Sequence, residues 1–299
     1  MAIEIKLIQT SFFKKGLHAE DILLDDLAYG VVDNTWRLID PRDLKSFYYC
    51  FYDPKHIGCG VRVYYDPRHK ESFSLTLPTP GTDYDIEVGY KVIARVMKKW
   101  NLNVFTQNDQ EYTFEDIYHL KEKMKQFNIG KLANVDTSSN TVLLPCVKWP
   151  ILFSSKEVEE WIEQEDIEAF TKRLHELQDN DYYYAIPRLF PISEHQLLAV
   201  YAISPDADTI LPNEPSLGLY LDEIYKRSSN LKKEFKVGLI SYVDRGVIGQ
   251  IPYESFLEEV SFETCEKYDE AHKIVKALSE ERIHEIAYKY RKEDEENKA

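Results

Sequence analysis

The residues with most scope for chemistry lie between Phe47 and Glu71, where the motif YDPKH is followed thirteen residues later by YDPRH. Thiolate and imidazole groups are the usual protein ligands of zinc. The candidate ligands in and beside the two repeats are Cys50, Cys59, His56 and His69. The first question is therefore whether the repeat encodes a metal site or something plainer.

Turn chemistry explains the repeat without a metal ion. Asp bonds to the backbone ahead of it and Pro presets the next φ angle, so Asp-Pro opens turns. Residues 47–77 are thus predicted to form a three-stranded antiparallel meander with turns at Asp53–His56 and Asp66–Lys70. At about 3.3 Å per residue the turns lie roughly 25–30 Å apart, at opposite ends of the middle strand. His56 and His69 cannot then share a metal ion, and we expect no metal site.

The turn lengths also predict strand register. A four-residue first turn sets Cys50 opposite Cys59, with Cβ atoms roughly 4.5–5.5 Å apart. A five-residue second turn sets Val63 opposite Phe73. We interpret the two cysteines as small buried hydrophobic residues with free thiols, and a redox pair is the less favoured alternative.

A metalloprotease motif is incomplete in this chain. His284 and Glu285 lie in a helical pattern, as the first two residues of H-E-x-x-H do. Tyr288 occupies the position of the second histidine, which that site needs on the same helical face. We interpret the segment as a solvated helix.

A group of acidic residues follows a predicted strand at Asp206, Asp208 and Glu214. Such acids occur in phosphoryl-transfer sites and calcium loops, but the calcium pattern fails because a required oxygen ligand and a required glycine are missing. A polar hairpin turn is the plainer interpretation. This remains the most enzyme-like place in the sequence.

Composition excludes other classes. The sequence contains no Walker A, G-x-G-x-x-G or G-x-S-x-G pattern and only 11 glycines, so phosphate-cradling loops are not expected. A net charge of −15, from 37 basic and 52 acidic residues, argues against nucleic acid and anionic membranes as partners. The same charge permits a basic protein partner. We expect no catalytic, cofactor-binding or metal-binding residues.

The strongest compositional feature is the acidic segment 154–181, with ten acidic and three basic residues. Its apolar residues recur with helical spacing, so Trp161 and Ile162 are predicted to face inward. A solvated helix face is the plainer interpretation, and a docking surface for a basic partner is the functional one. The candidate partner-binding residues are Glu157, Glu159, Glu160, Glu163 and Asp166.

Runs of strands alternate with runs of helices, which predicts an α+β fold with largely antiparallel sheets, packed helices and a helical C-terminus. Helices are predicted at 83–100, 113–127 and 154–177 and around 266–278 and 280–291, and C-terminal strands at 182–190, 196–203 and 234–243. The polar segment 133–141 is the most linker-like stretch. It predicts an N-terminal region at 1–135 and a C-terminal region at 142–299, or else one continuous domain.

The start of the chain, MAIEIKLIQT, alternates like a strand and does not resemble a signal peptide. None of the four cysteines has C-x-x-C spacing, which is typical of reduced thiols in the cytosol. We therefore expect a cytoplasmic protein.

Four segments together resemble a family of uncharacterised bacterial proteins of about this length, known only as a domain of unknown function. These segments are DLAYGVVDNTWRL (26–38), YDPKHIGCG (52–60), LTLPTPGTDYDIEVGY (75–90) and RGVIGQIPYESF (245–256). The resemblance implies a bacterial cytosolic protein, and it supplies no catalytic residues.

Two functional hypotheses remain. The first is a non-enzymatic protein-interaction or regulatory module with an acidic docking face, supported by the acidity and by 21 tyrosines, which interfaces favour. The second is an enzyme or small-molecule-binding protein whose site assembles from dispersed residues, with Asp206, Asp208 and the eight histidines as candidates. A deep pocket favours the second hypothesis, and a flat acidic face with exposed aromatic residues favours the first. The oligomeric state cannot be read from the sequence.

Overall fold

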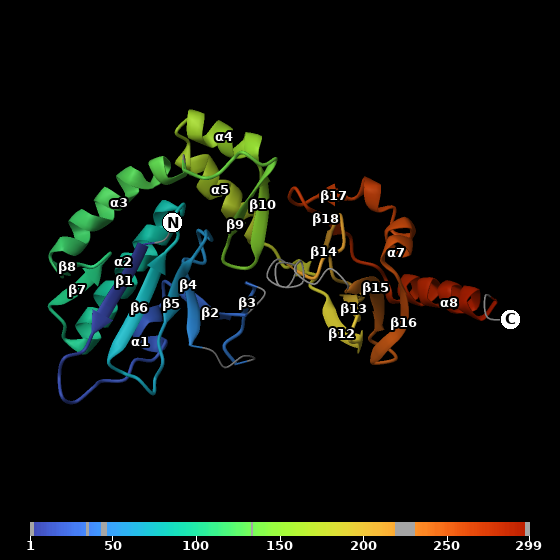
Figure 1. The fold of residues 1–299 in the computed structure, drawn as a ribbon, viewed down its shortest axis with the longest axis horizontal. Helices are drawn as coiled ribbons and strands as arrows, with labels where there is room; N and C mark the ends of the chain where they lie inside the picture. The colour runs from blue at the N-terminus through green and yellow to red at the C-terminus, as the bar shows by residue number, and fades with distance from the viewer. Residues whose placement is uncertain (1–2, 34–35, 43–46, 133, 219–230, 297–299) are drawn as a thin grey trace. The chain divides into compact units, whose positions relative to one another are not determined.

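A computed structural model describes residues 3–33, 36–42, 47–132, 134–218 and 231–296 of the chain. These residues fold into two compact units, Met1–Asn180 and Asp181–Ala299 (Figure 1). The fold is α+β with largely antiparallel sheets and a C-terminal helix, as predicted. In the described part of the chain, none of the helices combines the length and apolar character needed to cross a membrane.

The first unit is built on an eight-stranded antiparallel sheet of order β3-β2-β4-β5-β6-β1-β7-β8. Its strands are β1 (Ile3–Ile8), β2 (Ala28–Val32), β3 (Leu38–Ile39), β4 (Tyr48–Tyr52), β5 (Val61–Tyr64), β6 (Ser72–Leu77), β7 (Val104–Gln107) and β8 (Gln110–Thr113). Strand β1 alternates buried and exposed residues throughout. One face of the sheet therefore belongs to the core, and the other is more polar.

The meander of β4, β5 and β6 is confirmed, and both Asp-Pro motifs form the predicted turns. The Asp53 carbonyl accepts a bond from the His56 amide, and the Asp66 carbonyl accepts one from the His69 amide. In each turn the Asp carboxylate also accepts a bond from the amide two residues ahead. The repeat therefore encodes the same turn twice.

The predicted register was wrong at both turns. Cys50 lies opposite Arg62 rather than Cys59, and Val63 lies opposite Leu75 rather than Phe73. The first connection spans 53–60, because the Cys59 and Gly60 amides bond to the Asp85 carboxylate at 3.0 and 2.7 Å instead of entering the ladder.

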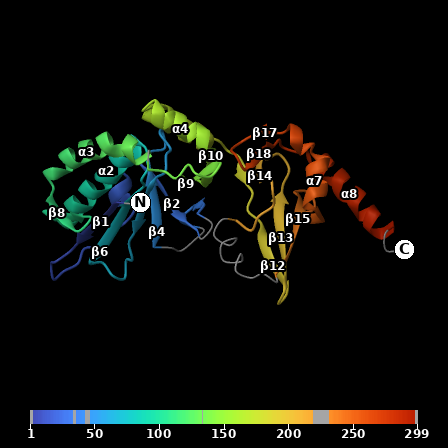
Figure 2. The same ribbon diagram turned by 45° about the horizontal axis from the view of Figure 1, so that its top comes forward.

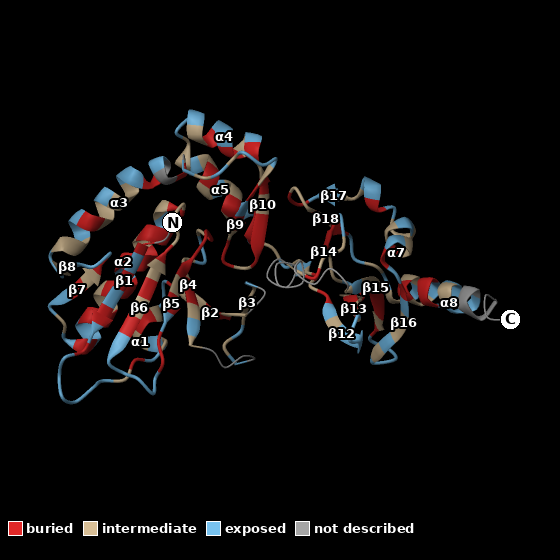
Figure 3. Ribbon diagram, in the orientation of Figure 1, coloured by how far each residue is buried: buried red, intermediate tan, exposed pale blue. Residues whose placement is uncertain are grey.

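Helix α2 (Asp83–Trp100) covers the apolar face of the sheet and ends where its sequence predicts. Thr82 caps its N-terminus in a capping box with Asp85, and Asn101 closes its C-terminus in the left-handed conformation. Its buried side chains join those of β1, β5 and β6 in one core. Figures 1 and 2 show α2 against the sheet with α3 (Asp116–Leu132) beside it, and in Figure 3 much of α3 is exposed.

Residues 141–178 belong to this first unit. They form the hairpin β9 (Thr141–Pro145) and β10 (Pro150–Ser154), followed by α4 (Ser155–Glu163) and α5 (Ile167–Gln178). The Gln178 side chain donates to the Gly58 carbonyl at 2.9 Å, and the Val147 amide donates to the same carbonyl at 3.1 Å. These long-range contacts explain why the compact units divide at Asn180 and not within the predicted linker 133–141.

The second unit contains two four-stranded sheets, of order β12-β13-β15-β16 and β11-β14-β18-β17. The strands are β11 (Tyr183–Tyr184), β12 (Arg188–Ser193), β13 (Gln196–Ile203), β14 (Thr209–Pro212), β15 (Lys232–Ser241), β16 (Gly246–Pro252), β17 (Glu266–Lys267) and β18 (His272–Val275). The pairs β13–β15 and β11–β14 are parallel. The described part of this unit also contains helices α7 (Tyr253–Glu259) and α8 (Glu280–Glu296) and a short helix η1 (Phe262–Thr264).

The prediction of a helix around 266–278 was wrong. That segment forms β17 and β18, joined by a turn in which Asp269 accepts a bond from the Ala271 amide at 2.8 Å. Ile274 and Val275 are buried, and β-branched residues favour a strand at such a position.

Candidate functional site

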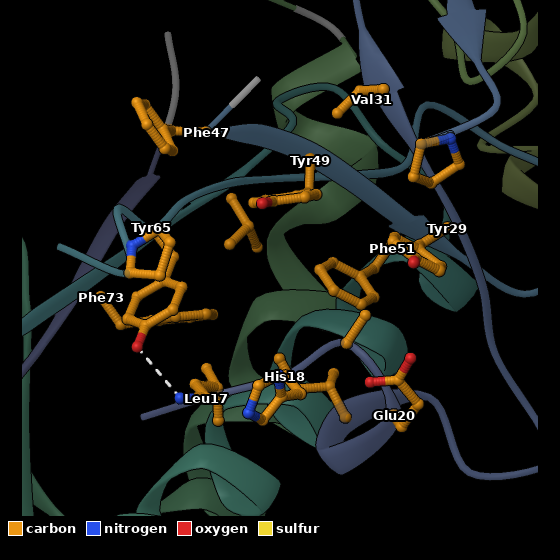
Figure 4. Close-up of a pocket in the computed structure, with 15 residues that line it drawn as sticks. Leu17, His18, Glu20, Tyr29, Val31, Phe47, Tyr49, Phe51, Tyr65 and Phe73 are labelled. Carbon is orange, nitrogen blue, oxygen red and sulfur yellow. Dashed lines mark hydrogen bonds between the residues drawn. The ribbon is translucent and has the colours of Figure 1, made fainter. Parts of the chain in front are cut away.

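An aromatic cavity of about 590 Å³ opens on the apolar face of the large sheet, between strands β2, β4 and β5 and helix α1 (Glu20–Leu23) (Figure 4). Its lining residues are Leu17, His18, Ala19, Glu20, Ile22, Tyr29, Val31, Pro41, Phe47, Tyr49, Phe51, Val63, Tyr65, Pro67 and Phe73. Alternate residues of a strand share one face of the sheet. The spacing of Tyr29 and Val31 in β2, and of Tyr49 and Phe51 in β4, therefore turns both pairs toward the cavity.

The opposite wall of the cavity depends on α1, which has four residues and no side-chain cap. So short a helix is unstable by itself, and helix α2 holds it in place. The Arg95 guanidinium donates to the Ile22 and Leu23 carbonyls at 2.6 and 3.2 Å, and Lys99 lies 2.6 Å from Asp21.

The aromatic rings of the cavity are packed against one another. Tyr29 stacks on Phe51 with ring centroids 5.7 Å apart and an interplanar angle of 17°, and it lies 6.4 Å from Tyr49. Tyr65 lies 6.4 Å from Phe73. Because the rings support one another, the cavity has a defined shape before any ligand arrives.

Three tyrosine hydroxyls supply the polar groups of the cavity. The Tyr65 hydroxyl accepts a bond from the Leu17 amide at 3.0 Å, which leaves its own proton available (Figure 4). Within the described residues, the hydroxyls of Tyr29 and Tyr49 have no hydrogen-bond partner. Burial raises the pKa of all three phenols, so they are neutral donors at physiological pH.

His18 and Glu20 are exposed and lie at the edge of the cavity, on the α1 side, across from Tyr49 and Phe51 (Figure 4). The described lining residues include no serine, threonine, cysteine, lysine or arginine. Among the described lining residues, the tyrosine hydroxyls are the donors that can orient a polar group of a molecule inside the cavity.

The sequence did not predict this site, although it contained one signal. Aromatic residues alternate in the run FYYCFY (47–52), so that one strand face carries Phe47, Tyr49 and Phe51. The position of α1 over that face depends on Arg95, which is distant in sequence from Ile22.

The acidic segment forms α4 and α5, and its five candidate carboxylates have different surroundings. Glu157 is half-buried 3.3 Å from Arg173, and Glu160 lies 3.7 Å from Lys156. Asp166 caps α5 by accepting a bond from the Ala169 amide at 2.8 Å. Glu159 and Glu163 are exposed.

The inward residues of the acidic segment are close to those predicted. Trp161 is buried and packs edge-on against Phe153 and Phe170, as the helical spacing predicts. Ile162 is only half-buried. Two of the five candidate carboxylates, Glu157 and Asp166, are therefore half-buried with partners in the chain, whereas Glu160 is exposed although Lys156 lies beside it.

The four cysteines are free. The thiol pair is Cys59 with Cys146, and hydrogen bonding between them together with burial raises the pKa of Cys59 well above its ordinary value. The predicted pairing of Cys50 with Cys59 was wrong because Gly60, not Cys59, packs against the Cys50 sulfur. Within the described ranges, no three side chains of the types His, Cys, Asp or Glu are arranged to hold a metal ion.

The acidic residues after β13 have a structural role in the second unit. Asp208 accepts bonds from the Ala277 amide at 2.8 Å and from Lys276 at 3.0 Å. Asp206 and Glu214 are exposed. Of these three acids, Asp208 is thus held by hydrogen bonds to the segment that follows β18.

Two histidines of the second unit belong to polar clusters. His272 joins β18 to β11, with Nδ1 2.7 Å from Asp269 and Nε2 3.1 Å from the Tyr184 hydroxyl. His284 Nε2 lies 3.2 Å from both Ser241 Oγ and Glu280 Oε1. Ser241 is fully buried, so its hydroxyl connects the β15–β16 turn to α8 and is not accessible to a substrate.

A protein-family model described as a domain of unknown function (DUF4299) matches residues 2–286. The match confirms the resemblance seen in the sequence to a family known only by that description, while the bacterial origin stays a prediction. No curated protein and no solved structure matches the chain.

Proposed function

The chain belongs to the DUF4299 family, and we propose that its first unit is a small-molecule-binding module that uses the aromatic cavity. The ligand has an apolar or aromatic body that fits between the wall formed by Tyr29, Tyr49 and Phe51 and the wall formed by α1, and a polar group that reaches the tyrosine hydroxyls. This is the second of the two hypotheses drawn from the sequence, with a site formed by aromatic residues in place of Asp206, Asp208 and the histidines.

The observation that carries this proposal is the cavity itself. Its volume of about 590 Å³ falls within the roughly 300–1,000 Å³ typical of ligand pockets, which are mostly apolar with a few placed polar groups. A core packed to ordinary density has few voids larger than a water molecule. A space of this size, lined by supported aromatic rings, is therefore suited to a ligand.

The test is a fluorescence titration of the full chain with Nile red, a neutral aromatic dye whose emission rises in apolar surroundings. Ala19 lines the cavity and is half-buried, so Ala19→Trp places the largest side chain in it. We expect this change to weaken binding by a factor of about ten or more, equivalent to about 1.4 kcal/mol.

The matched control is Leu24→Trp, because Leu24 is 64% exposed just beyond α1 and does not line the cavity. This variant is expected to bind the dye as the wild type does. Equal dye affinity in all three proteins would show that the dye binds elsewhere and would refute the proposal.

A second candidate is the docking of a basic protein on α4, supported by the exposure of Glu159 and Glu163 one helical turn apart. Like charges at this spacing are unfavourable for the helix by a few tenths of a kcal/mol, and they increase the association rate of a cationic partner at low salt. Such docking would give the protein the interaction or regulatory role of the first hypothesis drawn from the sequence.

This second candidate is tested by pull-down from the native lysate at low and high salt. Glu159→Gln with Glu163→Gln should abolish capture of any basic protein retained by the wild type. A control pair, Glu111→Gln with Glu115→Gln, removes the same charge from exposed sites near β8. Equal capture by both double variants would eliminate the docking surface.

The proposal places the protein in the cytoplasm. The four free cysteines, without C-x-x-C spacing, support a reducing compartment. Fractionation of the native cell followed by immunodetection tests this location, and recovery outside the soluble cytosolic fraction would contradict it.

A further inference from the structure

We propose that the ligand of the aromatic cavity is an organic cation, with an ammonium group on an apolar or aromatic body. This inference rests on the proposed small-molecule-binding function and specifies the chemistry of its ligand. It is supported by the aromatic residues that line the cavity and by the distribution of charge around them.

The rings come first. Six aromatic side chains line the cavity: Tyr29, Phe47, Tyr49, Phe51, Tyr65 and Phe73. The face of an aromatic ring attracts a cation within about 6 Å of its centroid, and cages of such rings are the usual receptors for quaternary ammonium groups. Phe47 already makes this contact within the chain, since the Arg68 guanidinium lies 4.6 Å from its centroid.

The charges of the lining point the same way. Glu20 is the carboxylate of the described lining, and no lysine or arginine accompanies it. Arg68, behind Phe47, is neutralised by Asp66 at 2.7 Å. Among the described lining residues, an anionic ligand would therefore lose its hydration without meeting a lysine or arginine, and the exposed His18 at the edge is the imidazole within its reach. Such desolvation is costly in a largely apolar site.

Two neighbouring carboxylates, which do not line the cavity, already have cationic partners. Asp21 pairs with Lys99 at 2.6 Å, and Asp26 pairs with Arg95 at 2.7 Å. Glu20 has no ion pair within the described residues. Its negative charge reaches into the cavity, since burial together with the charges of Glu20 and Asp40 raises the pKa of Tyr29. Glu20 is thus free to act as the counter-charge of an incoming ammonium group.

The experiment compares two molecules of nearly the same shape and different charge, phenyltrimethylammonium and tert-butylbenzene. Each is titrated against the full chain carrying bound Nile red, and displacement of the dye is measured. Because the faces of aromatic rings attract a cation and do not attract its neutral counterpart in this way, we expect the cation to compete roughly fivefold or more better than the neutral molecule.

Variants separate the two sources of this preference. Glu20→Gln should lower the affinity for the cation by roughly twofold to fivefold. The loss of affinity should be smaller at high salt, because salt screens surface charges. Its control Glu111→Gln removes an exposed carboxylate that does not line the cavity. Tyr49→Phe keeps the ring face and should retain the preference, whereas Tyr49→Leu should reduce it. The control Glu111→Gln should bind Nile red as the wild type does, and for the three variants in the lining the dye affinity is measured first so that the displacement constants are corrected for it.

Each outcome is decisive. If wild-type protein binds Nile red but tert-butylbenzene competes as well as the cation, the ligand is neutral and the inference is overturned while the binding function stands. The inference is also overturned if Glu20→Gln and Tyr49→Leu leave the preference for the cation unchanged, because the attraction then lies outside the cavity. If wild-type protein does not bind Nile red, the proposed function itself fails.

Discussion

Replacement of Gly60 by alanine tests how the first Asp-Pro loop is packed. Gly60 has φ +71°, in the left-handed region that disfavours a side chain. A Cβ atom there would lie 2.5 Å from the Cys50 sulfur and 2.8 Å from Val147 Cγ2. The backbone cannot retreat without loss of the 2.7 Å bond from the Gly60 amide to Asp85.

The two costs of this substitution can be added. The left-handed conformation costs an alanine roughly 1–2 kcal/mol, and overpacking of a filled core costs roughly 1–3 kcal/mol. We therefore expect Gly60→Ala to lower the free energy of unfolding by roughly 2–5 kcal/mol. Urea denaturation followed by tryptophan fluorescence measures this difference.

Two controls isolate the cause. Gly130 lies within helix α3 with nothing within 4 Å of its added Cβ, so Gly130→Ala should stabilise the protein by roughly 0.5–1 kcal/mol. Combining Cys50→Ala with Gly60→Ala removes the sulfur that the new Cβ meets and should cost less than the two single losses summed. A Gly60→Ala variant as stable as the wild type would refute the described packing of the loop.

Three further predictions concern the supports of the site. Hydrogen bonding to Arg68 lowers the pKa of Asp66 to about 2 from 3.8. This pair therefore stabilises the fold above about pH 4 and loses its effect toward about pH 2, so the stability deficit of Arg68→Met should vanish in acid; a constant deficit would contradict the pairing. Asp85→Ala leaves the amides of Cys59 and Gly60 without a hydrogen-bond acceptor. It should lower the free energy of unfolding, measured in urea, by roughly 3 kcal/mol or more; a loss below about 1 kcal/mol would contradict those bonds. Arg95→Ala removes the hydrogen bonds that hold α1. The free energy of dye binding should fall by at least as much as the free energy of unfolding; unchanged dye affinity would show that α1 is not part of the binding site.

The sequence predicts the elements whose signals are local. Helix α2 has both a capping box at Thr82 and a continuous apolar stripe, so its ends are where the pattern places them. The Asp-Pro turns form because their hydrogen bonds span two or three residues. Strand β13 matches the predicted range 196–203 because a continuous apolar run encodes it.

The failures share a cause, which is contact between residues distant in sequence. Asp85 draws the Cys59 and Gly60 amides out of the ladder, so turn length alone could not predict the register. Arg173, in the next helix, forms an ion pair with Glu157 of the acidic segment. The cavity depends on Arg95 to hold α1 over the β-strand face, and no spacing within α1 indicates that. A sequence pattern predicts which residues share a face, but not what lies opposite them.

Hydrogen–deuterium exchange with and without saturating Nile red tests whether the aromatic cavity is the ligand-binding site, because it reports where on the chain a ligand binds. A bound ligand slows exchange in the segments it stabilises, in proportion to its occupancy. Binding in the aromatic cavity predicts slower exchange in 17–23 and 47–52, which form opposite walls of the cavity, and no change in 196–203 of the second unit. Slower exchange confined to the second unit, or no change in 17–23 and 47–52 while the dye is bound, would contradict it.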